Sequence, residues 1–199
     1  MKIFASIMAF VAFTCAVTAA SASDFSASPV QPFPTTDNVP GPDALSTLKR
    51  RSSSLTVRVN TSNLDPLSPY TLWAVIFDRP QYCQSTPCSA ADLPVSPGHD
   101  PRVEAAIVFA GGGVADADGS GDFIGRVFVD GNGVITGERL MGVGVLNTQR
   151  AEVHIVVRGH GYPADEDVFS AISSFAGGCN ASNVCEDQQF AIHAGKSAK

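Results

Sequence analysis

Apolar and polar residues alternate with a period of two along several stretches of the chain. Over 55–60 the apolar positions are Leu55, Val57 and Val59, and polar residues occupy the positions between them. Successive side chains of an extended strand point to opposite faces, so this pattern predicts a strand with one apolar face and one solvated face. The segment 152–158 repeats the pattern and predicts a second strand of the same kind.

Other segments extend the all-β prediction. The run 70–77 is almost continuously apolar and contains the only tryptophan, Trp73, which is typical of a central strand buried on both faces. The residues at 130–133, Asp-Gly-Asn-Gly, favour a reversal of direction after the preceding strand. Further strands are predicted over 103–110, 123–129 and 189–193.

One segment departs from the period of a strand. Val168, Ile172 and Phe175 recur at helical spacing within 165–175, acidic residues crowd its start, and two glycines follow its end. Acids near the beginning and glycine just after the end are typical of a helix. The chain is therefore predicted to be all-β, an antiparallel Greek-key β-sandwich with one short helix near its C-terminal end.

The connection before the apolar run carries a second architectural signal. Leu64, Pro66 and Tyr70 are spaced as Leu-x-Pro-x-x-x-Tyr. This spacing resembles the tyrosine corner of fibronectin type III and related Greek-key sandwiches, in which the phenol bonds the backbone of the crossing connection. The alternative is a proline-containing turn followed by an ordinary core tyrosine. Either interpretation concerns the fold and implies no activity.

The first residues have the parts of an export signal. Lys2 is followed by a mostly apolar run over 3–19, and Ala-Ser-Ala at 20–22 fits the site cut by signal peptidase. We therefore expect 1–22 to be a signal peptide and the protein to be secreted or periplasmic.

Three regions are expected after the signal. The segment 23–46 is rich in proline and has little apolar periodicity, which predicts a flexible arm. A single β-sandwich domain is predicted over 47–194, with a polar tail at 195–199.

The charge balance narrows the choice of partners. The formal net charge is -6, and removal of Lys2 with the signal leaves one positive charge fewer, -7. An acidic chain of this kind is not expected to bind nucleic acid. No stretch after the signal approaches the roughly 18 unbroken apolar residues of a membrane helix, so no membrane span is expected once the signal is removed.

The cysteines are expected to form local disulfides. Four of the five remain after the signal, and an even number in an exported chain favours disulfide bonds. The short spacings favour Cys83 with Cys88 and Cys179 with Cys185, although the sequence leaves the crossed connectivities and a four-cysteine zinc site open.

One loop resembles part of a calcium site. Asp116, Asp118, Ser120 and Asp122 place oxygen side chains at alternate positions, and glycine stands at position six, as in an EF-hand loop. Position twelve is Val127, where an EF-hand requires glutamate. A Gly/Asp-rich hairpin tip explains the same residues, and a calcium-stabilised surface or adhesion module is the functional alternative.

Three histidines offer a transition-metal alternative. His154 lies on the polar face of its predicted strand, His160 follows in a glycine-flanked loop, and His193 ends the last strand. If these strands are neighbours, the imidazoles can converge on zinc or copper in a metal-binding protein or a metal-dependent enzyme. Isolated surface or hydrogen-bonded structural histidines are the alternative.

A broader resemblance covers most of the chain after the signal. The segments 60–77, 83–88, 146–161 and 177–179 are similar to an uncharacterised family of exported microbial proteins. The resemblance implies export and a compact β-rich domain, and it supplies no substrate, cofactor or catalytic residue.

The same resemblance draws attention to one polar strand face. Glu152, His154, Arg158 and His160 are candidates for a ligand site at the rim of the sandwich. Pairing of these side chains with neighbouring strands is the alternative. No motif nominates a catalytic residue, so the sequence favours a non-catalytic binding or structural protein whose ligand is unknown.

Overall fold

The computed structural model describes residues 24–130, 132–142, 147–161, 168–180 and 184–196. The predicted signal peptide, the acidic start of the predicted helix and the last three residues of the tail lie outside this part. The strands are β1 (Phe25–Pro29), β2 (Gln31–Pro32), β3 (Leu45–Arg51), β4 (Ser54–Thr61), β5 (Pro69–Phe77), β6 (Ala105–Val114), β7 (Gly121–Val129), β8 (Ile135–Thr136), β9 (Arg139–Met141), β10 (Glu152–Gly159) and β11 (Glu186–His193). The helical elements are η1 (Pro80–Tyr82), η2 (Ala90–Asp92), η3 (Pro101–Val103) and α1 (Val168–Ser173).

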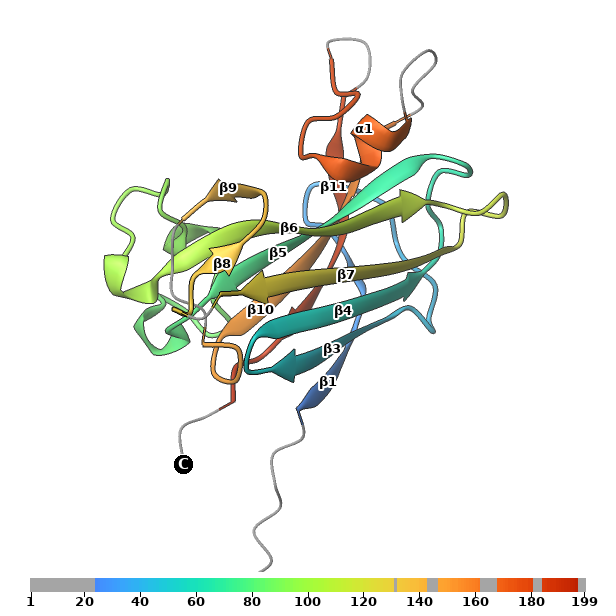
Figure 1. Cartoon of the computed structure of the whole chain (residues 1–199). Coiled ribbons are helices and arrows are strands. Elements are labelled where there is room, and N and C mark those ends of the chain that lie inside the picture. Colours follow the sequence, from blue (N-terminus) through green and yellow to red (C-terminus); the bar gives the residue numbers. More distant parts are fainter. Residues whose placement is uncertain (1–23, 131, 143–146, 162–167, 181–183, 197–199) are drawn as a thin grey trace, which may run out of the picture.

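The strands form two antiparallel sheets. One sheet has the order β1-β3-β4-β7-β8, and the other has the order β2-β11-β10-β5-β6-β9. In Figure 1, β1, β3, β4 and β7 lie one above another. The helix α1 lies at one end of the molecule, where it contacts β5 and β6. The prediction of an antiparallel β-sandwich with one short helix is confirmed for the described residues, while the Greek-key detail stays a prediction.

The period of two determines which side chains enter the core between the sheets. Every second residue of β7 is buried, and β4 buries Leu55, Val57 and Val59 as the sequence predicts. These side chains belong to one cluster with Leu72 and Ile155 of the opposite sheet. Each large aliphatic side chain buried in this way contributes about 1.5–3 kcal/mol, so the cluster is the main source of stability.

Glycines let β6 and β7 cross closely although they belong to different sheets. A Cβ atom at Gly111 would lie 2.6 Å from the carbonyl oxygen of Ile124, and one at Gly125 would lie 2.8 Å from that of Ala110. No side chain fits between these backbones, which explains glycine in the middle of both strands.

The connection from β4 to β5 crosses from one sheet to the other. The hydroxyl of Tyr70 accepts a hydrogen bond from the backbone N–H of Asp65 at 2.9 Å. Its ring is buried and lies 5.8 Å from the ring of Phe123. The contact expected of a tyrosine corner is therefore present, and the likeness to fibronectin type III domains stays a prediction.

The proline-rich segment is not a flexible arm over its described residues. β1 pairs with β3 from Phe25 opposite Lys49 to Pro29 opposite Leu45, and β2 pairs with β11. Both are edge strands, where proline is tolerated because one side of the strand makes no ladder bonds. The prolines hid these strands from the period-based reasoning that predicted an arm.

Two excursions leave the second sheet, and each carries a disulfide. Cys83 is bonded to Cys88, and Cys179 to Cys185, with Cα–Cα distances of 5.4 Å in both pairs. The predicted connectivity is confirmed. Among the described residues, no helix has the length and apolar character required to cross a membrane.

Candidate functional site

The four residues of the predicted rim site divide into two pairs along β10. Glu152 and His154 lie near its beginning, and Arg158 and His160 lie at its end. Arg158 lies four positions after His154 along the strand, a span of about 13 Å. The structure does not bring these four side chains into one group, each pair makes its own contacts, and a shared ligand site stays a prediction.

The first pair holds the Cys83–Cys88 excursion against the sheet. The buried carboxylate of Glu152 accepts hydrogen bonds from the backbone N–H of Cys88 and from Nε2 of His154, both at 2.7 Å. The imidazole of His154 also packs against the ring of Phe77, with 5.1 Å between the ring centroids. Loss of Glu152 would leave a buried N–H without its acceptor.

The second pair holds the excursion that contains α1. Arg158 donates to the carbonyl of Phe175 at 3.1 Å and to Asp187 at 2.8 Å, and its guanidinium lies 4.0 Å from the centroid of the Phe175 ring. His160 is buried between the hydroxyl of Thr71 and the carbonyl of Gly177, each 2.8 Å away. Burial lowers the pKa of His160, which favours a neutral imidazole.

His193 lies between the two sheets, on the other face of its sheet from His154. It pairs with Val153, whereas His154 pairs with Ile192, so the two imidazoles point to opposite faces. The ring nitrogens of His193 lie 3.0 Å and 2.9 Å from the hydroxyls of Ser26 and Ser46. Burial, reinforced by the charge of Arg50, lowers the pKa of His193 to about 4.

The predicted three-histidine metal site is therefore not assembled. In the described part of the chain, two groups of side chains bring possible metal-ligand atoms close together. One group is His160, Cys179 and Cys185, and the other is Cys83, Cys88 and Asp92. The cysteines of both groups are joined as disulfides, which removes the thiolates that a metal would need.

The predicted calcium residues form a tight turn between β6 and β7. The hydroxyl of Ser120 donates to Asp118 at 2.6 Å and to Asp116 at 3.3 Å. Asp122 turns away from this group and binds Arg58 through two hydrogen bonds of 2.7 Å and 2.5 Å. The hairpin-tip interpretation accounts for these contacts, in which Asp122 pairs with Arg58 and not with the other three residues.

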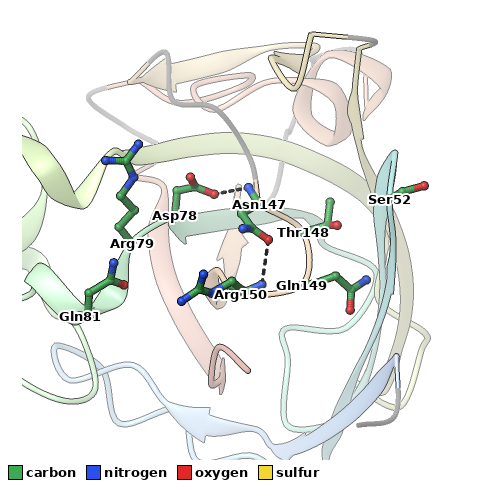
Figure 2. A pocket seen from close by; sticks show the side chains of 8 residues that line it. All are labelled: Ser52, Asp78, Arg79, Gln81, Asn147, Thr148, Gln149 and Arg150. Atoms are coloured by element: carbon green, nitrogen blue, oxygen red, sulfur yellow. Dashed lines mark hydrogen bonds between the residues drawn. The ribbon is translucent and has the colours of Figure 1, made fainter. Parts of the chain in front are cut away.

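A polar cleft lies at the end of the sandwich that carries the Cys83–Cys88 disulfide. It has a volume of about 580 Å³ and collects residues from three distant segments. These are the turn between β3 and β4, the end of β5 with η1, and the turn before β10. The lining residues, shown in Figure 2, are Ser52, Asp78, Arg79, Gln81, Asn147, Thr148, Gln149 and Arg150.

Asp78 joins two of these segments. Its carboxylate accepts a hydrogen bond from the backbone N–H of Asn147, drawn as a dashed line in Figure 2. Burial raises the pKa of Asp78, and the nearby carboxylate of Glu104 raises it further. The amide oxygen and carbonyl of Asn147 accept from the N–H of Arg150 at 3.2 Å and 3.1 Å, which closes the turn.

A buried arginine supports the same turn from inside the sandwich. Arg50 is only 2% exposed, and its guanidinium donates to the carbonyls of Thr148 at 2.8 Å and Ala151 at 2.9 Å. It also donates to Ala194 at 3.1 Å and to His193 at 3.4 Å. Burial lowers the pKa of Arg50 to about 10, and the four carbonyls compensate for its lost hydration.

Arg150 stands where the first cleft meets a second one. The second cleft has a volume of about 440 Å³ and shares Gln81 and Arg150 with the first. Among the described residues, no hydrogen bond or ion pair engages the guanidinium of Arg150. Figure 2 shows Arg79, Gln81 and Arg150 on one side of the cleft and Ser52 on the opposite side.

Sequence reasoning missed both residues that organise this cleft. Arg50 lies in a run of three basic residues at 49–51, and Asp78 directly follows the apolar run 70–77, so neither position stands out in the sequence. The alternation of β3 contained the missing signal, because Arg50 lies two residues after Leu48 and therefore on its buried face.

Comparison of the chain with known proteins found no matching family model, no matching curated protein and no matching solved structure. The similarity to exported microbial proteins stays a prediction.

Proposed function

We propose that this protein is an exported, non-catalytic binding module that takes a small, hydroxyl-rich carboxylate ligand in the end cleft. The observation that carries the proposal is the guanidinium of Arg150, which has no described partner and stands at the junction of two polar clefts. A guanidinium matches the two oxygens of a carboxylate with two parallel hydrogen bonds.

The groups around Arg150 suit the same ligand. The amide of Gln81 lines both clefts, and Thr148 and Gln149 add further hydrogen-bonding groups to the first. Arg79 adds a second cation, which is half exposed and 3.1 Å from Glu104. The carboxylate of Asp78 is engaged by the backbone N–H of Asn147.

The size and lining of the cleft define the class of ligand. A volume of about 580 Å³ falls within the range of small-molecule sites. The described residues that line this cleft are all polar or charged, so a ligand with several hydrogen-bonding groups would find partners in it. A sugar acid, which carries one carboxylate and several hydroxyls, fits both the charge and the hydrogen-bonding groups.

Other features support binding over catalysis and export over retention. His154, His160 and His193 are each engaged in contacts that hold the fold together. Two disulfides are consistent with an oxidising compartment, so we propose a secreted or periplasmic location, with 1–22 removed as a signal peptide.

Titration calorimetry with galacturonate, and with galactose as the neutral matched sugar, tests the proposal. We expect galacturonate to bind with a Kd of about 1 mM or lower, and galactose not to bind. Arg150→Gln should weaken galacturonate binding at least roughly tenfold, because a charge-assisted hydrogen bond contributes about 1.5–3 kcal/mol.

Arg139→Gln is the control, since it removes an equal charge from the exposed edge strand β9. Equal binding by Arg150→Gln and Arg139→Gln would refute the site. Absence of galacturonate binding to the unmodified protein would refute the ligand class.

A further inference from the structure

The outward-facing residues of β1, β3, β4 and β7 form a surface that the end cleft does not use. The exposure of β7 alternates residue by residue, and the strand registers place Phe25, Lys49, Thr56 and Arg126 in one row across the sheet. Further outward positions lie in parallel rows on both sides. We call this surface, made by the outward residues of the four strands, the basic face.

The basic face has an unusual charge for this protein. Its cations are Lys49 and Arg51 of β3, Arg58 of β4 and Arg126 of β7, and its one acid is Asp122. It therefore holds four of the 13 lysines and arginines and one of the 19 acids of the chain. The face carries +3 while the whole chain carries -6, so the remainder carries -9 (-6 less +3).

The cations are held in a regular array. Neighbouring strands lie about 4.8 Å apart, and alternate residues of one strand lie about 6.7 Å apart. Lys49 and Arg51 are alternate residues of β3, and their side-chain cations form no hydrogen bond or ion pair with any described residue. Arg126 donates to the hydroxyl of Thr56 at 3.2 Å, and the Arg58–Asp122 pair is exposed to solvent. An exposed pair of this kind adds little stability and exchanges partners readily.

Polar and apolar groups lie between the cations. Thr47, Thr56 and Asn60 place a hydroxyl or an amide beside them. Phe25 is 53% exposed and Phe128 is 51% exposed, at opposite margins of the face. Such a surface offers hydrogen bonds to hydroxyls, ion pairs to carboxylates and ring faces to pyranose rings.

We propose that the basic face binds a linear anionic polysaccharide. A polymer with one carboxylate on each sugar meets several cations of the array at once, and the sum of such contacts gives affinity that one pair cannot supply. A second copy of this face is disfavoured as the occupant because two +3 surfaces repel each other. A bilayer fits less well, because the exposed apolar side chains of this face are interspersed with its cations on three strands; they are Phe25, Leu45, Ile124 and Phe128.

Affinity measurements with polygalacturonate test the proposal, with neutral dextran as the uncharged polymer. We expect polygalacturonate to bind at 50 mM NaCl and to dissociate at 0.5 M NaCl, because salt screens exposed charges. The Lys49→Glu/Arg51→Glu variant should lose at least tenfold in affinity.

The matched control is Arg102→Glu/Arg139→Glu, which changes the net charge by the same amount on η3 and β9. Circular dichroism must show both variants folded. If the charge reversal does not fold, Lys49→Gln/Arg51→Gln replaces it, with an expected loss of at least threefold.

Three results would overturn the proposal. One is equal affinity of the basic-face variant and the control variant for polygalacturonate. Another is binding of dextran with the same affinity as polygalacturonate. The third is binding to phosphatidylglycerol vesicles without binding to polygalacturonate, which would assign the face to a membrane. The cleft proposal is tested separately, because neither Lys49 nor Arg51 lines the cleft.

Discussion

His193 makes stability depend on pH in a way that a single substitution can isolate. The buried imidazole contacts Ser26 and Ser46 in its neutral form, and Arg50 and His154 are the charged or titratable groups that lower its pKa. The pKa falls from 6.5 to about 4 on folding. The unfolded chain therefore binds a proton more readily than the folded protein between these two values.

The expected size follows from this difference. A pKa difference of 6.5 less about 4 corresponds to about 3 kcal/mol at 1.36 kcal/mol per unit. This stability is fully present above pH 6.5 and is lost as the pH falls toward 4. Burial also lowers the pKa of His160, so this residue likewise makes the protein less stable at low pH. Burial raises the pKa of Asp78, which has the opposite effect on stability. Only a comparison of variants therefore isolates the contribution of His193.

Urea unfolding at pH 7 and pH 4 measures the effect. The unmodified protein should lose about 3 kcal/mol more unfolding free energy on acidification than His193→Gln, which cannot titrate. His99→Gln, in the loop between η2 and η3, is the control and should keep the full loss. Equal pH dependence of the unmodified protein and His193→Gln would refute the reasoning.

Two further substitutions test the structural roles assigned above. Arg50→Met leaves four carbonyls without their donor and should lower the unfolding free energy by about 3 kcal/mol. The control Arg102→Met changes an exposed side chain and should lower it by less than about 0.5 kcal/mol. Similar losses for both variants in urea unfolding would contradict a supporting role of Arg50. Tyr70→Phe removes the hydroxyl that accepts from Asp65 and should cost about 1 kcal/mol in the same assay, so an unchanged midpoint would show that this contact is not stabilising.

The sequence predicted those parts of the fold that are determined by residues close together in the chain. Alternation located β4 and β10, and the apolar run located β5, because burial follows directly from the period of a strand. Short cysteine spacings gave the two disulfides for a similar reason, since close pairs meet without help from the rest of the fold. Proline concealed β1 and β2, and the partner of β2, β11, also lies far away in sequence.

The candidate sites depend on contacts that the period does not contain. His154 and His193 could be placed on strands, but only the register shows that they face opposite sides of one sheet. The end cleft is built by the β3–β4 turn, the end of β5 and the turn before β10, so no local pattern marks it. Arg50 was missed although the sequence holds a signal for it, since it alternates with Leu48 on the inward face of β3.

The central claim is that the end cleft binds a small carboxylate, and NMR titration of the isotope-labelled protein with galacturonate tests it most directly. Binding should shift the backbone amides of Gln81, Gln149 and Arg150, with little change on the basic face. Shifts confined to other surfaces, or no saturable shifts at all, would contradict the claim.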